Sequence, residues 1–331
     1  MLDELEPLAA SPAAYAFVVL LGLLWGSFAN VCIYRWPPTE AFPGGRSVVK
    51  PGSHCFACQT PIRWYDNVPL ASWLWLRGRC RACGAAFSAR YLIVEALTGV
   101  LFAVAWWATT ANLPAELRGL VHAEPFDVRL IRFAICAAFI LVMVVITFID
   151  LDHKLILNKV TVPSIVVFYA LGLLLPERVW WDGLIGIAVG YGVPWAIGEI
   201  YYRSTGREGL GLGDGMLLAL VGALLGWKGV LAALFGGSLI GSVIGVAVLA
   251  ISRRRRQPQP DNSQVAPETT PASEPGEATE PGEATEPGEE PDEAPSLMRT
   301  ELPFGPFLAM AAVFYLYAEP WIQLHFRFLG G

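Results

Sequence analysis

Charged residues are scarce in this 331-residue chain, because Asp, Glu, Lys and Arg together make up only 16% of it, against about 25% in an ordinary soluble domain. Cysteine is also rare: six residues are far too few for a disulfide-stapled secreted scaffold. Apolar residues, by contrast, make up 54% of the chain. These proportions exclude an ordinary soluble protein and indicate a membrane protein.

The negative net charge of the chain comes from one acidic segment, and the rest of the chain has a small excess of basic residues. Residues 257–300 hold eleven acidic residues and one basic residue, and the hexapeptide Glu-Pro-Gly-Glu-Ala-Thr occurs twice in 274–285. Such a sequence cannot bury enough apolar surface to offset its chain entropy, so we expect residues 253–300 to form a disordered spacer. The remainder carries 22 basic and 18 acidic residues, and this mild excess argues against nucleic acid as a partner.

Apolar runs long enough to cross a bilayer recur along the chain. A transmembrane helix needs about 20 mostly apolar residues, and we therefore expect an all-α polytopic membrane protein with about eight transmembrane helices. The boundary between the sixth and seventh is weak, because only Trp227-Lys228 separates them. The expected spans are 13–33, 91–110, 131–149, 160–175, 183–202, 215–227, 229–251 and 303–320.

The basic residues predict the orientation of these spans. If the N-terminus lies outside, the segments placed inside carry 17 Lys and Arg residues and the other segments carry six. Cytoplasmic loops carry the excess of Lys and Arg. We therefore expect the N-terminus outside and the large loops in the cytoplasm.

Four cysteines form two Cys-x2-Cys pairs inside the polar segment 35–90, namely Cys55 with Cys58 and Cys80 with Cys83. Such pairs, here 21 residues apart, are typical of a tetrahedral four-cysteine zinc site. Two disulfides or a redox-active pair are the alternatives, and the reducing cytoplasm disfavours the disulfides. We expect a small cytoplasmic domain with structural zinc between the first two transmembrane helices.

Carboxylates at the ends of apolar spans are the candidate catalytic groups. Asp150 and Asp152 end the third span, Asp214 begins the sixth, and Glu95 lies one turn inside the second, so all fall at the predicted inner edge. Two carboxylates held close can share a proton and activate water, as in aspartic proteases. Gly211 and Gly213 remove side-chain bulk beside Asp214, which lets a substrate backbone approach.

The sequence does not settle which of the first two acids faces Asp214, or whether these acids are catalytic. Asp150 and Asp152 lie about 200° apart around a helix, so only one of them is expected to face Asp214. The alternative to catalysis is that the acids cap helices or pair with Lys154 and Lys159 near the membrane surface.

Motifs in order along the chain resemble those of the type IV prepilin peptidase family. The matching segments are Gly26-Ser27-Phe28-Ala29-Asn30-Val31, Tyr34-Arg35-Trp36-Pro37, the two cysteine pairs, Asp66-Asn67-Val68-Pro69-Leu70, Arg90-Tyr91 with Glu95, Ile149-Asp150-Leu151-Asp152-His153, Glu208-Gly209-Leu210-Gly211-Leu212-Gly213-Asp214 and Pro303-Phe304-Gly305-Pro306-Phe307.

The resemblance implies an aspartic endopeptidase of the bacterial inner membrane. Asp150 and Asp214 would be its catalytic pair, with Gly211, Gly213, Glu95 and Asp152 as supporting residues, and the four cysteines would bind zinc. Its substrates would be prepilins or type II secretion pseudopilins, whose basic leader is cut on the cytoplasmic side. Many members also methylate the new N-terminus with S-adenosylmethionine, but the sequence nominates no residue for that step.

Two departures from the family pattern support a non-enzymatic alternative. Leu157 stands where the family usually has proline, and Met216 stands where it usually has lysine. The alternative is a degenerate peptidase fold that docks assembly partners through its zinc domain. On either hypothesis the expected parts are residues 1–34 with the first helix, the zinc domain 35–90, the transmembrane core 91–252, the acidic insert 253–300 and the last helix in 301–331.

Overall fold

The computed structural model describes residues 6–110, 125–206, 211–255 and 303–325, which are mostly helical. Within these ranges the only β-pairings are three isolated bridges, all in the segment between α2 and α4. The helices are α1 (Glu6–Ala9), α2 (Pro12–Arg35), the 3-10 helix η2 (Trp64–Asn67), α3 (Ala71–Trp75), α4 (Arg90–Thr109), α6 (Phe126–His153), α7 (Asn158–Gly172), α8 (Trp180–Thr205), α9 (Leu212–Arg255) and α10 (Gly305–His325).

The chain divides into two compact units. The first comprises residues 1–241 and 303–331, and it contains every candidate site residue. The second comprises residues 242–302, of which the structure describes only the helical stretch 242–255 at the end of α9. The predicted acidic insert 253–300 therefore lies almost wholly outside the described residues.

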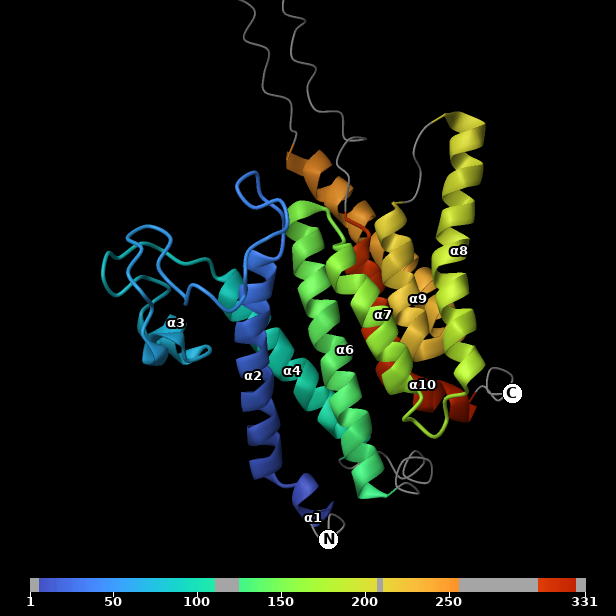
Figure 1. The fold of residues 1–331 in the computed structure, drawn as a ribbon, viewed down its shortest axis with the longest axis horizontal. Helices are drawn as coiled ribbons and strands as arrows, with labels where there is room; N and C mark the ends of the chain where they lie inside the picture. The colour runs from blue at the N-terminus through green and yellow to red at the C-terminus, as the bar shows by residue number, and fades with distance from the viewer. Residues whose placement is uncertain (1–5, 111–124, 207–210, 256–302, 326–331) are drawn as a thin grey trace, which may run out of the picture. The chain divides into compact units, whose positions relative to one another are not determined.

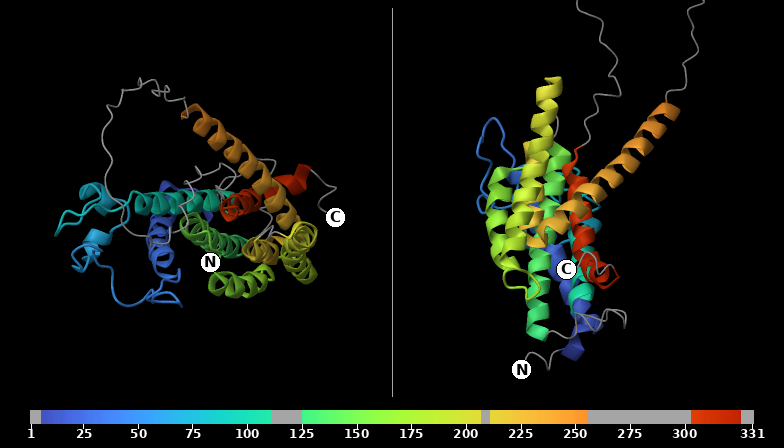
Figure 2. Two further views of the ribbon diagram at one scale, coloured as in Figure 1. Left: turned by 90° about the horizontal axis from the view of Figure 1, so that it is seen from above. Right: turned by 90° about the vertical axis from the view of Figure 1, so that its right-hand side faces the viewer.

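Helix α6 forms the centre of the first unit. It contacts α2, α4, α7 and α10, and the ribbon shows it between α2 and α7 (Figure 1). Its side chains Phe139, Ile140, Met143 and Ile146 are at most 2% exposed. In the right-hand view of Figure 2, the axes of α6, α7 and α8 are nearly parallel. This packing fixes the ends of α6, and with them Asp150.

Helices α2 and α4 pack closely because α2 carries two glycines four residues apart. A Cβ at Gly22 would lie 2.8 Å from the Cα of Gly99, and one at Gly26 would lie 2.8 Å from the Cα of Glu95. Real Cβ atoms do not come so close to backbone, so only glycine allows this approach. Small residues at such spacing are typical of helix pairs in membranes.

Local signals in the sequence account for several helix ends. The Ser11 hydroxyl accepts a hydrogen bond from the backbone N–H of Ala14, 3.2 Å away, and Pro12 follows as the first helical residue of α2. Helix α8 ends at Gly206, which has a left-handed backbone (φ 67°). Helix α6 ends in the same conformation at Lys154 (φ 50°), whose backbone N–H donates to the carbonyl of Asp150.

The structure has helices in all eight predicted spans, and among the described residues five helices are long and apolar enough to cross a membrane: α2, α4, α6, α8 and α9. With 15 residues, α7 reaches only about 22 Å, less than the hydrocarbon core. The predicted spans 215–227 and 229–251 both lie in α9, which is kinked at Gly226 (φ 69°, ψ −175°). The weak boundary at Trp227-Lys228 thus follows a kink within one helix.

Candidate active site and metal centre

Asp150 lies in the last turn of α6 and is only 5% exposed. Its Oδ2 atom is buried, and among the described residues no side chain donates a hydrogen bond to it. The first residue of α10, Gly305, lies against this carboxyl, because a Cβ there would be 2.5 Å from Asp150 Oδ2, and the backbone N–H of Gly305 interacts with it. A buried carboxyl without a charged partner is costly in a purely structural role and is expected where a carboxyl must receive a proton or a water.

Asp214 lies in the first turn of α9, on a helix far along the chain from α6. Its backbone N–H donates to the carbonyl of Gly211, 3.1 Å away, and its charge interacts with that of Asp150. Ile156 lies against a glycine next to each acid's position: a Cβ at Gly213 would be 3.1 Å from Ile156 Cβ, and one at Gly305, which contacts Asp150, would be 3.4 Å from Ile156 Cδ1. These contacts bring the start of α9 and the end of α6 into the same region of the first unit.

The second acid of the Asp150 motif faces elsewhere. Asp152 forms an ion pair with Arg90, the first residue of α4, and its side chain is 28% exposed. The ammonium group of Lys159, which was a candidate partner for these acids, donates instead to the carbonyl oxygens of Trp36 and Gly44. Of the two motif acids, Asp150 is thus the one beside Asp214.

Glu95 is 8% exposed and contacts the cysteine segment rather than the acid pair. Its Oε2 accepts a hydrogen bond of 2.8 Å from the backbone N–H of Leu70. Leu70 has a left-handed backbone (φ 56°) just before α3. Glu95 therefore anchors the segment that carries the cysteines to α4.

The sulfur atoms of Cys55, Cys58, Cys80 and Cys83 all lie within 4.8 Å of one another. The Cys55–Cys83 distance is 3.8 Å and the Cys58–Cys80 distance is 4.0 Å. A tetrahedron of sulfurs with metal bonds of about 2.3 Å has edges of about 3.8 Å. The cluster could therefore hold a metal ion.

Both Cys-x2-Cys pairs use the same backbone turn. The N–H of Cys55 donates to Thr60 and that of Cys80 to Ala85, while the residue after each pair, Gln59 or Gly84, has a left-handed backbone and donates back to the first cysteine. These turns direct donors at sulfur. Hydrogen bonding with the side chain and backbone of Thr60 lowers the pKa of Cys58 to about 6, and the backbone N–H groups of Cys83 and Ala82 lower the pKa of Cys80.

The sequence alone assigned no role to three residues in the region of Asp150 and Asp152. Gly305 contacts the Asp150 carboxyl, Ile156 lies against Gly213 and Gly305, and Arg90 pairs with Asp152. The motifs Arg90-Tyr91 and Pro303-Phe304-Gly305-Pro306-Phe307 were a signal for Arg90 and Gly305. Ile156 lies just beside Leu157, a departure from the family pattern, and nothing in the sequence marks it.

Comparisons with known proteins identify the family. Residues 20–109 match the family model described as Bacterial Peptidase A24 N-terminal domain, and residues 137–246 match that described as Type IV leader peptidase family. No solved structure matches the chain.

Three relatives carry the name prepilin leader peptidase/N-methyltransferase. The protein of Myxococcus xanthus is 34% identical over 94% of this chain and 92% of its own length. That of Aeromonas salmonicida is 34% identical over 74% of this chain and 84% of its own length. That of Neisseria gonorrhoeae is 33% identical over 74% of this chain and 85% of its own length. The chain therefore belongs to the type IV leader peptidase family.

Proposed function

We propose that this protein is a membrane aspartic endopeptidase that removes the basic leader of type IV prepilins or type II secretion pseudopilins and then methylates the new N-terminus. The relatives' shared name supports both activities. The observation that supports the proposal is that the ends of α6 and α9 that carry Asp150 and Asp214 pack around Ile156 and Gly305, and that the charge of Asp150 acts on Asp214. Residues from α6, α9 and α10 build this site, so it depends on the whole first unit.

The two acids divide the chemistry between them. Held close, two carboxylates resist ionising together, so one keeps a proton while the other is charged. The charged one takes a proton from water, and that water attacks the scissile carbonyl carbon. The protonated one polarises the carbonyl oxygen and then supplies the proton for the leaving amine. No covalent intermediate with the protein forms.

The location of the acids fits a substrate that is itself a membrane helix. Asp150 ends one apolar helix and Asp214 begins another, so both lie where a span meets the membrane surface. The distribution of Lys and Arg favours the cytoplasmic side for this end and the outside for the N-terminus. A substrate with an apolar helix in the bilayer would present the bond before that helix at this depth.

We assign zinc to the four-cysteine cluster as a structural ion. Four thiolates fill a tetrahedral sphere and leave no position for water, so the ion would hold the two turns together. The sulfur–sulfur distances support this assignment: 3.8 Å between Cys55 and Cys83, and 4.0 Å between Cys58 and Cys80. Asp150 and Asp214 remain the groups that activate water.

The test is cleavage of a prepilin-like peptide by purified protein in lipid nanodiscs. We expect Asp150→Asn and Asp214→Asn each to abolish cleavage, since each removes one half of the acid pair. Asp152→Asn is the matched control: it weakens a partly exposed ion pair worth about 1 kcal/mol or less, so cleavage should fall about fivefold at most. Full activity in both site variants would eliminate the peptidase and favour a docking protein.

A further inference from the structure

Two tryptophans on short helices of the cysteine segment are almost fully exposed. Trp64 in η2 is 83% exposed and Trp75 in α3 is 82% exposed, more than any other large apolar side chain that the structure describes. Leu74, beside Trp75, is 61% exposed. Because η2 and α3 contact each other, we treat them as one unit, the η2–α3 element (residues 64–76). Exposed apolar groups gathered on one element mark a surface that another molecule covers.

The two sides of α3 have different surroundings. The indole N–H of Trp73 is buried, and this ring lines a cavity together with Asn30 of α2 and Tyr91 of α4. Successive residues of a helix are about 100° apart, so Trp75 lies about 200° around the axis from Trp73. Trp75 therefore faces away from α2 and α4, on the side that the described protein leaves uncovered.

The chain enters α3 from a point well inside the ends of the neighbouring helices. The backbone N–H of Leu70 donates to Glu95 Oε2, 2.8 Å away. Glu95 lies five residues after the start of α4, about 8 Å along its axis. A Cβ at Gly26 would be 2.8 Å from the Cα of Glu95, and Gly26 lies nine residues, about 14 Å, before the end of α2. Since both helices are long and apolar enough to cross a membrane, α3 begins below the level at which they leave it.

The Leu70 side chain extends the lipid-facing surface of α2 and α4. It lines an apolar groove of about 390 Å³ between these helices. Val100 and Trp107 of α4 line the same groove and are exposed, as side chains of a membrane span are where they meet lipid. The ribbon shows α3 at a level between the two ends of α2 (Figure 1). The η2–α3 element is therefore continuous with a surface that lipid covers.

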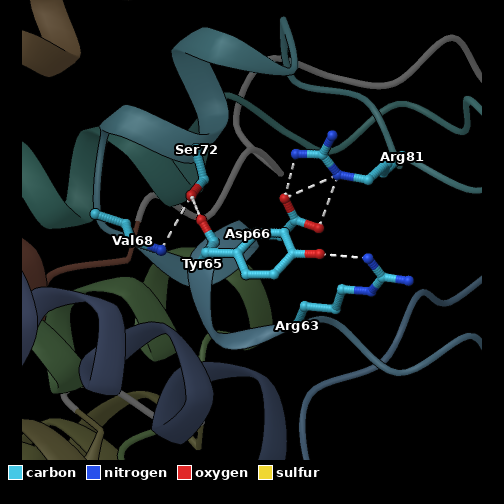
Figure 3. Close-up of polar contacts among 6 residues, drawn as sticks. All are labelled: Arg63, Tyr65, Asp66, Val68, Ser72 and Arg81. Carbon is cyan, nitrogen blue, oxygen red and sulfur yellow. Dashed lines mark hydrogen bonds and ion pairs between the residues drawn. The ribbon is translucent and has the colours of Figure 1, made fainter.

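The backbone of this element is paired as a lipid environment requires. In hydrocarbon every N–H must find its partner within the protein. The Ser72 hydroxyl accepts from the N–H of Val68 at 3.0 Å and donates to the carbonyl of Tyr65 at 2.9 Å, which joins η2 to α3 (Figure 3). Backbone N–H groups that donate to backbone carbonyls at 2.6–3.2 Å are those of Ala71, Ser72, Leu74, Leu76, Arg77 and Gly78. The element can therefore enter lipid without leaving these donors unsatisfied.

Arginines flank the element on both sides. From residue 63 to residue 81 the chain has four arginines and one acid, Asp66. Arg81 donates to both carboxylate oxygens of Asp66 at 2.6–3.0 Å (Figure 3). The other three, Arg63, Arg77 and Arg79, are exposed and form no ion pair with an acid in the described part of the chain. Arginines beside an apolar surface favour the phosphate groups of anionic lipids.

We propose that the η2–α3 element is an interfacial membrane anchor, which inserts Leu74 and Trp75 between the headgroups and acyl chains of anionic phospholipids and places the flanking arginines at their phosphates. A helix that lies in the membrane surface buries its apolar face about 5–10 Å into this boundary, and tryptophan is enriched there. The anchor goes beyond the proposed peptidase activity. It holds the four-cysteine cluster at the end of the membrane where α2 ends and α4 begins.

The first test is photo-crosslinking of the full-length protein in nanodiscs of phosphatidylcholine and phosphatidylglycerol. At position 75, p-benzoylphenylalanine should form a phospholipid adduct, measured by intact mass, with a yield about tenfold higher than at position 42. Phe42 is the matched control, because it is aromatic, 50% exposed and lies in the loop that follows α2. Equal yields at the two positions would overturn the proposal.

The second test uses the sign of a stability effect. Because Trp75 makes few contacts with the protein, Trp75→Ala in water would leave α3 unchanged or slightly favour the helix. In lipid the same change removes a buried apolar side chain, so amide hydrogen exchange of residues 71–78 should become about tenfold faster. Phe42→Ala should leave that exchange unchanged. Unchanged or slower exchange in Trp75→Ala would mean that water, not lipid, surrounds this side chain.

The third test varies the charge of the lipid. In nanodiscs that contain phosphatidylglycerol, Arg77→Gln and Arg79→Gln should each speed exchange of residues 71–78 about fivefold, and in phosphatidylcholine alone neither should have this effect. Lys50→Gln is the control, since Lys50 is exposed and lies outside the element. An equal effect in both lipids would overturn the placement of the arginines at anionic headgroups. None of these measurements uses leader cleavage, so their failure would leave the proposed peptidase intact.

Discussion

Gly305 lies so close to Asp150 that a Cβ at Gly305 would be 2.5 Å from the carboxylate Oδ2. The contact joins the start of α10 to the end of α6, across more than 150 residues of chain. No side chain fits there while the carboxyl keeps its position. The glycine therefore determines where one of the two proposed catalytic oxygens can be.

Gly305→Ala should displace this carboxyl and slow cleavage about 100-fold, because a shift of about 1 Å in a catalytic group can cost that much. The measurement is kcat for leader cleavage, with thermal unfolding as a check on folding. Gly192→Ala is the control, since no atom lies within 4 Å of a Cβ at Gly192 in α8. A Gly305→Ala enzyme as fast as wild type would show that Asp150 can move freely.

The ion pair between Arg90 and Asp152 can be tested by charge exchange. Arg90→Asp places two like charges together, and we expect lower thermal stability and slower cleavage than in wild type. The double variant Arg90→Asp with Asp152→Arg restores an opposite pair and should recover most of the loss. The coupling in this double-mutant cycle should be about 1 kcal/mol, since both side chains are nearly 30% exposed. Additive effects would mean that the pair does not hold α4 to α6.

The features that the sequence could predict are those with a local signature. The cysteine cluster is one, since each pair forms its own turn and spacing alone suggests a shared ion. The break near Trp227-Lys228 is another, because a glycine at 226 permits the kink. The apolar runs also predict helices correctly, although α7 has only 15 residues.

Contacts between distant segments could not be predicted in this way. Periodicity places Asp150 and Asp152 on different sides of a helix, but it does not say which side faces Asp214. That choice depends on Gly305 and Arg90, 155 and 60 residues away from Asp150 along the chain. A cavity of about 670 Å³ between the cysteine segment and α2 and α4 could not be predicted for the same reason, because Asn30 on α2 and Trp73 in the cysteine segment line it together only in the folded chain.

Metal retention should depend on the Thr60 hydroxyl and on pH. Zinc binds thiolates and not thiols, so protons compete with the metal for the four sulfurs and release should grow as pH falls. Hydrogen bonding with Thr60 lowers the pKa of Cys58 and so favours the thiolate that the metal needs. Thr60→Val removes the hydroxyl that lies 3.2 Å from Cys58 Sγ and should weaken zinc binding about tenfold, moving release to higher pH. Thr60→Ser keeps the hydroxyl and is the control.

The measurement is zinc released to a colorimetric chelator during an acid titration of the full-length protein. Identical release curves for Thr60→Val and Thr60→Ser would show that the hydroxyl does not act on the thiolate. A protein that folds and retains its activity with no metal at all would contradict the structural role of the ion.

Gly84 and Gly52 provide a test of backbone strain without side-chain contacts. A Cβ at either position would meet no atom within 4 Å, but Gly84 has φ 74° and Gly52 is outside the left-handed region. Gly84→Ala should therefore destabilise the second cysteine turn by about 1 kcal/mol, whereas Gly52→Ala should be neutral or slightly stabilising. Hydrogen exchange of residues 79–87 measures the difference. Equal protection in the two variants would mean that the turn at Gly84 relaxes, and the equivalent turn already accepts Gln59 at φ 56°.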